Sequence, residues 1–315
     1  MRFLKQQIDR WAIRAAAKSL PRLAPRCDQA AEVTDLLARS DLFSPPESVP
    51  VATLQKDHSF AFLSSVRTPY PRNNTVHGHL FPTARDWRNH PSVILLHGWN
   101  AEMHYLAILP KLAHRLNRRG LNAVAMELPY HLQRRPVRGE QISNFISEDI
   151  PRMLEATRQA IADLNALIHW LKAEGSPAIA TWGFSLGGWL VGLHLCESSA
   201  QDAAVLTTPV SNLQRAVAEL EFCHPIRAAL QIVPANLESL NLPARKPKIA
   251  PEKIYMVEAA HDLFVPSATY REVADAWRLP PWEVVPQSHI TVLVSKKASK
   301  QTIEWLVGQL RPGGP

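Results

Sequence analysis

The sequence predicts an α/β fold in which a mostly parallel central sheet is flanked by helices. From residue 92 onward, short apolar runs alternate with longer segments of helical periodicity, which is typical of parallel strands joined by crossover helices. The chain of 315 residues is 46% hydrophobic, enough to bury a sizeable core. Six strands are expected, at Ser92–Leu96, Asn122–Glu127, Ala178–Gly183, Ala203–Thr207, Lys253–Glu258 and Trp282–Val285.

Helices are expected in the segments between these strands. Their approximate limits are residues 102–119, 147–173, 186–198, 267–277 and 292–310. Residues 211–250 have a mixed helical pattern interrupted by prolines, which predicts a small helical cap inserted over the sheet. Upstream, Phe60–Leu63 and Val76–Phe81 are candidate strands of an antiparallel leading edge. Residues 27–315 are therefore expected to form one domain.

Residues 1–26 are predicted to form a separate basic amphipathic helix, ended by Pro21 and Pro25. They contain seven basic residues against Asp9 alone, so they hold nearly all of the net charge of +7. The expected apolar face consists of Phe3, Leu4, Ile8, Trp11, Ala12 and Ala15. Two interpretations stay open: an anchor on anionic lipid or a transit peptide, or a helix that packs its apolar stripe on the body.

Composition excludes several classes of function. Because the body is nearly neutral, a nucleic-acid partner is not expected. Three cysteines without CxxC spacing, Cys27, Cys196 and Cys223, indicate neither a disulfide framework nor a zinc site, and no metal or organic cofactor is expected. The longest uncharged stretch contains GFSLGG, which favours a strand, turn and helix over a membrane span. A cytoplasmic protein, with possible peripheral membrane contact through residues 1–26, is the expected localisation.

Glycines crowd around Ser185 in the segment TWGFSLGGWL, although the whole chain has only 12. The spacing Gly183-x-Ser185-x-Gly187 directly after an apolar run is typical of a nucleophile on a sharp strand-to-helix turn. Because Ser185 opens a helix, the backbone N–H of Leu186 is expected to face a reacting carbonyl. The sequence thus predicts Ser185 as a nucleophile and Leu186 as an oxyanion donor.

A second oxyanion donor is expected in the loop after the strand at residues 92–96. This loop reads His97-Gly98-Trp99-Asn100. Gly98 would let the backbone approach a substrate, so that the N–H of Trp99 completes the oxyanion hole. We expect His97 to hydrogen-bond the loop backbone rather than to act in catalysis.

A serine nucleophile needs a histidine that takes its proton and an acid that orients the histidine. Beyond the strand at residues 253–258 only His261 and His289 remain, and only His289 lies downstream of Asp262, which follows that strand. With the order Ser, acid, His that this type of sheet uses, the predicted triad is Ser185, Asp262 and His289. Glu258, which ends the same strand as a competing acid, stays an alternative.

On these motifs the chain resembles the α/β-hydrolase superfamily over about residues 75–311, and within it the lidded esterase-like branch that includes the abhydrolase-domain-containing proteins. The resemblance implies an eight-stranded, mostly parallel sheet. The expected function is a serine esterase or lipase-type hydrolase that cleaves a carboxylic ester, possibly a lipid acyl ester, through an acyl-enzyme. Alternatives are an acyltransferase with the same triad and a non-catalytic relative that binds a ligand.

The loop after the strand at residues 122–127 is a candidate substrate-binding segment. Tyr130 and His131 could line the acyl or alcohol site, and Arg134 and Arg135 could bind a phosphate or carboxylate of the substrate. The alternative is a polar loop with solvated arginines. The expected partner is a small-molecule or lipid ester.

Overall fold

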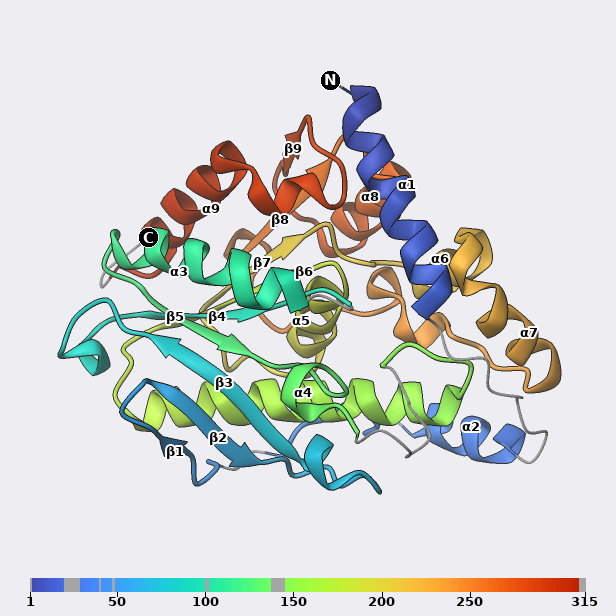
Figure 1. Ribbon diagram of the computed structural model, residues 1–315, viewed down its shortest axis with the longest axis horizontal. Coiled ribbons are helices and arrows are strands. Elements are labelled where there is room, and N and C mark those ends of the chain that lie inside the picture. Colours follow the sequence, from blue (N-terminus) through green and yellow to red (C-terminus); the bar gives the residue numbers. More distant parts are fainter. Residues whose placement is uncertain are drawn as a thin grey trace.

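The computed structural model describes residues 2–19, 29–39, 41–46, 49–99, 102–136 and 145–311. Its centre is a nine-stranded sheet with the order β1-β2-β3-β5-β4-β6-β7-β8-β9. The strands are β1 (Thr53–Leu54), β2 (Ser59–Leu63), β3 (Thr75–Phe81), β4 (Ser92–Leu96), β5 (Asn122–Met126), β6 (Ile179–Phe184), β7 (Ala203–Thr207), β8 (Ile254–Ala259) and β9 (Glu283–Val285). Figure 1 shows β1, β2 and β3 at one end of this sheet.

The strands from β5 to β9 pair in parallel, whereas β1, β2 and β3 form an antiparallel edge. All residues of β4, β5, β6 and β7 are buried, as expected for parallel strands covered on both faces. In β3 buried residues alternate with half-buried ones. The six predicted strands and the antiparallel edge are confirmed. The sheet has one strand more than the resemblance implied, the two-residue β1.

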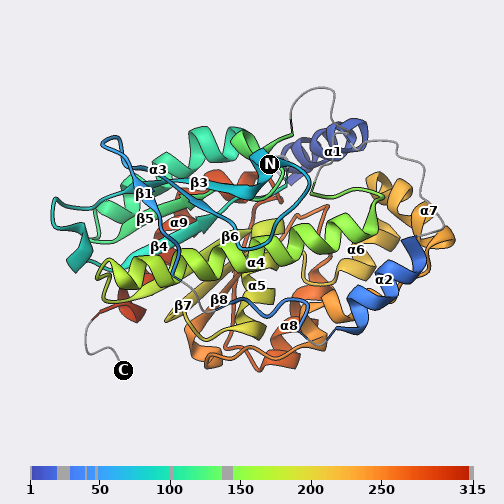
Figure 2. The ribbon, with the colours of Figure 1, turned by 90° about the horizontal axis from the view of Figure 1, so that it is seen from below.

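Helices pack on both faces of the sheet. They are α1 (Arg2–Ser19), α2 (Gln29–Ala38), α3 (Leu109–Asn117), α4 (Ile150–Ala173), α5 (Leu186–Glu197), α6 (Leu213–Glu219), α7 (His224–Ile232), α8 (Ser267–Trp277) and α9 (Lys296–Gln309). Along β4, Val93 and Leu95 pack with α3 and α9, whereas Ile94 and Leu96 pack with α4 and α5. The result is a three-layer arrangement of helices, sheet and helices (Figures 1 and 2).

Two predicted helices are interrupted. The segment predicted as one helix at residues 102–119 contains a π-helical turn, His104–Ile108, before α3 begins with Pro110 in its first turn. The last predicted helix is split at Ser295, whose side chain caps α9 by accepting a hydrogen bond from the Ala298 N–H. In both cases the α-helix begins at a residue that favours a helix start, Pro110 in the first turn of α3 and Ser295 as the N-cap of α9.

A helical cap is inserted between β7 and β8, within the predicted range of residues 211–250. It contains α6, α7 and the short turns η5 (Glu221–Cys223), η6 (Glu238–Leu240) and η7 (Leu242–Ala244). Two buried tryptophan side chains of the body donate hydrogen bonds to the cap. Trp189 Nε1 donates to the Leu240 carbonyl at 2.8 Å, and Trp277 Nε1 donates to the Leu242 carbonyl at 3.0 Å. The cap is therefore anchored at its C-terminal half.

The N-terminal helix α1 is present and lies against η5 of the cap (Figure 1). The large residues of the predicted apolar face point outward, since the exposed fractions of Phe3, Leu4 and Trp11 are 68%, 69% and 72%. The interpretation that α1 packs its apolar stripe on the body is therefore wrong. The buried side of the helix instead carries Asp9 and Ala16. Pro21, Pro25 and Cys27 lie outside the described residues. Among the described helices, none combines the length and apolar composition needed to cross a bilayer.

Candidate active site

Ser185 occupies the sharp turn between β6 and α5. Its backbone has φ 53° and ψ −115°, a conformation that costs a residue with a side chain about 1–3 kcal/mol. The turn is held because the Ser185 N–H donates to the Thr207 carbonyl at 2.9 Å and the Ser185 carbonyl accepts from the Trp189 N–H. Glycine is needed at 187, since a Cβ there would lie 2.6 Å from the carbonyl oxygen of His97. The predicted strand, turn and helix are thus present.

Three side chains from separate loops form a continuous hydrogen-bonded chain at the carboxyl edge of the sheet. His289 Nε2 lies 2.8 Å from Ser185 Oγ, and His289 Nδ1 lies 2.8 Å from Asp262 Oδ2. In the neutral imidazole that fits these contacts, Nδ1–H donates to Asp262 and Nε2 accepts from the Ser185 hydroxyl. The structure therefore brings together the three residues that the sequence analysis grouped.

The carboxylate of Asp262 is held in place by its own loop. Oδ1 accepts from the N–H groups of Phe264 at 2.7 Å and Val265 at 2.9 Å, and Oδ2 accepts from the Tyr270 hydroxyl at 3.2 Å. The competing acid, Glu258, accepts instead from Ser267 and from the Trp282 indole. The structure thus places Asp262, and not Glu258, beside the imidazole.

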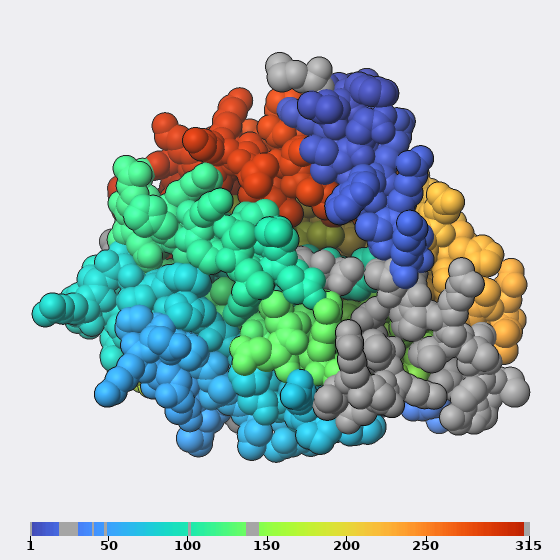
Figure 3. Space-filling view, viewed as in Figure 1, coloured from blue at the N-terminus to red at the C-terminus, as the bar shows by residue number. Residues whose placement is uncertain are grey.

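The His289 imidazole is buried, and its pKa reflects opposing effects. Burial lowers the pKa, but the charge and hydrogen bond of Asp262, with a contribution from the charge of Asp9, raise it above its ordinary value. Ser185 itself is only half-buried, in contrast to its neighbours Phe184 and Leu186. Figure 3 shows a hollow beside α1 with atoms of the β6–α5–β7 part of the chain at its floor.

The loop after β4 reaches the turn at Ser185. A Cβ on Gly98 would lie 3.4 Å from the Cβ of Ser185 and 4.0 Å from its Oγ, so the backbone of this loop runs directly beside the hydroxyl. His97 is fully buried, and burial lowers its pKa to about 3. Its Nδ1–H donates to the Gly98 carbonyl at 2.7 Å, and its Nε2 accepts from the Leu128 N–H at 3.1 Å. As predicted, His97 holds the backbone of the loop that carries Trp99.

A row of aromatic rings, missed by the sequence analysis, borders the site. The ring of Trp99 stacks on Phe222 of the cap at 5.6 Å between centroids, Phe222 lies 6.0 Å from Phe264, and Phe264 stacks on the His289 imidazole at 4.5 Å. Phe222 and Phe264 carry no motif, and only the fold brings them to Ser185. We refer to Trp99, Phe222 and Phe264 as the aromatic row.

The predicted substrate residues Tyr130 and His131 are both buried. Tyr130 is 2% exposed and packs edge-on against Tyr70. The His131 imidazole lies edge-on to His97, with 4.9 Å between centroids, and burial lowers its pKa to about 4. His131 Nδ1 lies 2.8 Å from the Pro129 carbonyl. The His131 ring thus packs against His97 in the loop that holds Trp99, whereas the Tyr130 ring packs against the segment before β3.

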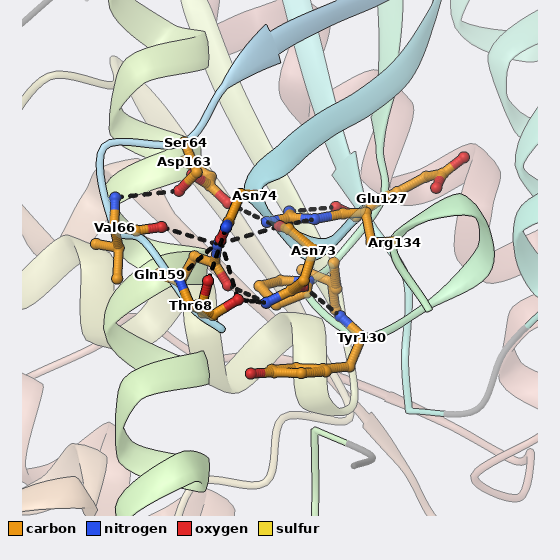
Figure 4. Close-up of polar contacts among 12 residues, drawn as sticks. Ser64, Val66, Thr68, Asn73, Asn74, Glu127, Tyr130, Arg134, Gln159 and Asp163 are labelled. Atoms are coloured by element: carbon orange, nitrogen blue, oxygen red, sulfur yellow. Dashed lines mark hydrogen bonds and ion pairs between the residues drawn. The ribbon is translucent and has the colours of Figure 1, made fainter. Parts of the chain in front are cut away.

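The prediction that Arg134 binds a substrate anion is wrong, and so is the alternative of a solvated side chain. Arg134 is 0% exposed. Its guanidinium donates to the carbonyls of Asn73 and Glu127 and forms an ion pair with Asp163 at 2.8 Å (Figure 4). Arg135 is half exposed and forms an ion pair with Glu102 at 2.5 Å. Arg134 therefore belongs to a buried polar network that joins three parts of the chain.

The described residues offer no group of three or more His, Cys, Asp or Glu side chains that could hold a metal ion. Cys196 and Cys223 are buried and unpaired, and burial raises the pKa of each thiol to about 12. Both thiols are therefore protonated at neutral pH. The hydrogen-bonded chain from Asp262 through His289 to Ser185 is an arrangement that can activate a hydroxyl for attack on an electrophilic carbonyl.

Comparison with known proteins bears on the family and the fold. A model of the alpha/beta hydrolase family matches residues 93–313. Similar solved structures are an acetyl xylan esterase from Paenibacillus sp. R4 (15% identity, 92% of this chain, 98% of that chain, TM-score 0.54) and a cold-adapted esterase from an Arctic intertidal metagenomic library (18%, 83%, 98%, 0.54). The esterase Pf2001 of Pyrococcus furiosus is also similar (17%, 85%, 100%, 0.52).

At these identities the structural likeness shows the fold alone. No curated protein matches the chain significantly. The family model, by contrast, spans most of the chain, including Ser185, Asp262 and His289. The expected resemblance and fold class are thereby confirmed: the chain belongs to the alpha/beta hydrolase family.

Proposed function

We propose that the protein is a serine esterase in which Ser185 is the nucleophile, His289 the general base and acid, and Asp262 the residue that orients His289. The observation that carries this proposal is the hydrogen-bonded chain of two 2.8 Å contacts that ends at the hydroxyl of Ser185, a half-buried residue. A serine hydroxyl is inert at neutral pH unless a base accepts its proton, and this geometry supplies one. The esterases of similar fold are consistent with ester chemistry.

The reaction follows from these positions. Ser185 Oγ bonds to the ester carbonyl carbon while its proton moves to His289 Nε2, and the carbonyl oxygen becomes an oxyanion. His289 then returns the proton to the leaving alcohol as the carbon–oxygen bond breaks, which leaves an acyl group on Ser185. A water molecule, deprotonated by His289, attacks this acyl group and releases the carboxylic acid and the free serine. Asp262 stabilises the transient imidazolium.

The oxyanion is proposed to be stabilised by the backbone N–H groups of Leu186 and Trp99. Leu186 is the first residue of α5, where the N–H groups of a helix lack intrahelical partners and the helix dipole favours negative charge. Trp99 follows Gly98, whose close approach to Ser185 brings this loop to the nucleophile. Loss of one such donor typically costs about 10²–10³ in kcat.

Hydrolysis of a panel of p-nitrophenyl esters by wild type and Ser185→Ala tests the proposal. Wild type is expected to release the alcohol and the acid in equal amounts, and Ser185→Ala to be inactive although folded. Ser267→Ala is a matched control, because Ser267 bonds Glu258 outside the proposed triad. A folded, homogeneous wild type that hydrolyses no ester and reacts with no fluorophosphonate would support the non-catalytic alternative instead.

For the substrate, we propose an ester with an apolar acyl or alcohol part. The aromatic row lies along the site from the loop of Trp99 to the imidazole of His289, and apolar surface favours apolar substrate groups. Phe222→Ala is therefore expected to raise KM more for longer acyl chains than for acetate. Equal effects on acetyl and octanoyl esters would argue against this role of the aromatic row.

We further propose that α1 contacts an anionic lipid surface. Its outward face carries Phe3, Leu4 and Trp11, with exposed Arg14 and Lys18 beside them. Apolar side chains flanked by cations are the composition of interfacial helices. Lipid acyl esters then become candidate substrates.

Co-sedimentation with vesicles tests this contact. Wild type is expected to bind phosphatidylcholine vesicles that contain phosphatidylglycerol, and to bind pure phosphatidylcholine less. The triple variant Phe3→Ser, Leu4→Ser, Trp11→Ser is expected to lose this binding, while Val49→Ser and Val51→Ser, exposed apolar residues elsewhere, serve as the control. Binding that survives the triple variant would contradict the proposal.

A further inference from the structure

Asp9 is the one acidic residue among the first 26 residues, and its side chain is 0% exposed. It lies on the side of α1 opposite Trp11, and so faces the body. A buried carboxylate is unfavourable unless hydrogen-bond donors surround it. The partners of Asp9 therefore indicate why an acid is present in an otherwise basic helix.

Three backbone N–H groups donate to Asp9, and all belong to the loops that carry Asp262 and His289. Asp9 Oδ2 accepts from Leu263 N–H at 3.1 Å and from His289 N–H at 3.0 Å, and Oδ1 accepts from Ile290 N–H at 3.1 Å. One donor thus follows Asp262 directly, and another is the backbone of His289 itself. A single carboxylate joins both loops at the residues that would do the chemistry.

The connection made by Asp9 differs from the other links between these loops. At their bases, the Ala260 N–H donates to the Val285 carbonyl and the His261 N–H donates to the Gln287 carbonyl, as an extension of the β8–β9 pairing. Asp262 follows His261 directly, and His289 lies two residues beyond Gln287. The bonds to Asp9 come from α1, which lies far away in the sequence, and fix the loops where the ladder has ended.

One turn earlier, Lys5 Nζ donates to the Pro286 carbonyl, which places a second polar contact between α1 and the loop of His289. At the far end of the buried side, Ala16 packs into the core. The helix therefore contacts the body at several points. The three hydrogen bonds of Asp9 form one part of this contact, and Lys5 and Ala16 form other parts.

We propose that Asp9 is a positioning residue of this active site, which holds the backbones of Asp262 and His289 so that the imidazole can bridge Asp262 and Ser185. The proposal rests on the proposed esterase function. Small displacements of catalytic groups reduce rates strongly, by up to about 10²-fold for 1 Å. The N-terminal helix would then be a part of the catalytic framework and not an appendage.

The charge of Asp9 has a second consequence for His289. His289 contacts Asp262 at Nδ1, Ser185 at Nε2 and the ring of Phe264, and its backbone N–H donates to Asp9. The titratable groups one contact further away are Tyr270, which donates to Asp262, and Lys5, which donates to the Pro286 carbonyl. Among these, the negative charges of Asp262 and Asp9 raise the pKa of His289. Removal of the Asp9 charge is therefore expected to lower this pKa, in addition to loosening the loops.

Asp9→Asn, in the full-length protein, tests both consequences. Asparagine keeps the shape of the side chain but turns a donor toward backbone N–H groups and removes the charge. We expect kcat for a soluble p-nitrophenyl ester to fall about 10- to 100-fold with a much smaller change in KM. The acid limb of the pH profile of kcat/KM is expected to move to lower pH, because His289 must be neutral to act as the base.

Two variants of the same helix separate this role from simple docking. Arg10→Gln changes the neighbouring exposed residue and is expected to leave kcat and the acid limb unchanged. Lys5→Met removes the contact with Pro286 but keeps Asp9. Because this variant removes a positive charge, the acid limb of the kcat/KM profile should not move to lower pH. If Lys5→Met reproduces both changes of Asp9→Asn, docking of the helix and not Asp9 is responsible, and the proposal is overturned.

The outcomes also distinguish this proposal from the proposed function. A wild type that neither hydrolyses esters nor reacts with a fluorophosphonate contradicts the function itself. A wild type that depends on Ser185, with Asp9→Asn equal to it in kcat and acid limb, contradicts only the role of Asp9. If Asp9→Asn does not fold by circular dichroism, Asp9→Glu keeps the charge but displaces the carboxylate: a lower kcat with an unchanged acid limb supports the proposal, and a wild-type kcat contradicts it.

Discussion

Two clusters of polar side chains follow parallel strands of the same sheet, and they differ in what they leave accessible. At the ends of β6, β8 and β9, the hydrogen-bonded chain from Asp262 through His289 ends at the hydroxyl of Ser185, which is a half-buried residue. After β5, Arg134 is surrounded by Asn73, the Glu127 carbonyl and Asp163, with no exposed surface (Figure 4). The first cluster can offer a reactive atom to a substrate, and the second cannot.

The comparison shows that position at a strand end does not by itself make a polar residue functional. A guanidinium has five donors, and Arg134 makes four hydrogen bonds with them, to the carbonyls of Asn73 and Glu127 and to the Asp163 carboxylate. The side chain therefore joins the segment before β3, the loop after β5 and α4. The expected effects of mutation accordingly differ in kind: loss of rate in the first cluster, and loss of stability in the second.

The largest effect is expected at Ser185. Ser185→Ala removes the proposed nucleophile and is expected to lower kcat for ester hydrolysis by about 10⁶-fold. Steady-state hydrolysis with high enzyme concentration measures the residual rate. A residual rate within tenfold of wild type would show that Ser185 is not the nucleophile. The first cluster would then have no catalytic role that distinguishes it from the second.

Asp262→Asn is expected to lower kcat by about 10⁴-fold, because an amide favours the wrong tautomer of His289. Glu258→Gln is the matched control, since Glu258 ends the same strand but binds Ser267 and Trp282. The control should keep a rate close to that of wild type after correction for any change in folded fraction. If Glu258→Gln lowered kcat more than Asp262→Asn, Glu258 would be the acid that orients His289.

In the second cluster, Arg134→Met is expected to lower the free energy of unfolding by about 3–5 kcal/mol, because Asp163 is left as a buried charge without its partner. KM of the remaining folded enzyme should not change. Arg135→Gln breaks the half-exposed pair with Glu102 and should cost less than about 1 kcal/mol. Urea denaturation of both variants measures this contrast, and a large rise in KM with unchanged stability for Arg134→Met would restore its role as a substrate ligand.

The smallest expected effect is on pH dependence. The pKa of His289 lies above its ordinary value of 6.5 because the charge and hydrogen bond of Asp262 outweigh burial. Since the neutral imidazole is the base, kcat/KM should fall as pH decreases through this raised pKa, with a midpoint above 6.5. A profile of kcat/KM between pH 5 and pH 9, within the range in which the protein stays folded, checks the sign.

The sequence was sufficient to predict the fold class and the grouping of Ser185, Asp262 and His289. Gly183-x-Ser185-x-Gly187 after an apolar strand has a steric cause that is local in the sequence, and chain order restricted the histidine to His289. Strand limits were also predictable, because buried parallel strands read as continuous apolar runs.

Burial across distant segments could not be predicted. Arg134 resembled a solvated or substrate-binding residue, since nothing local indicates that Asp163 and the Asn73 carbonyl meet its guanidinium. Asp9 gave one weak signal, as the lone acid in a basic helix, but its partners lie more than 250 residues away. The helical periodicity identified which residues form the apolar face of α1. It could not show whether this face points toward the body or toward solvent.

The most direct measurement of the central claim is the site of covalent reaction with a fluorophosphonate, mapped by peptide mass spectrometry. The account predicts a single adduct on Ser185 in the wild type, formed far more slowly in His289→Ala because the hydroxyl then lacks its base. An adduct on another residue, or equal rates of modification in the presence and absence of the His289 imidazole, would contradict the proposed chemistry.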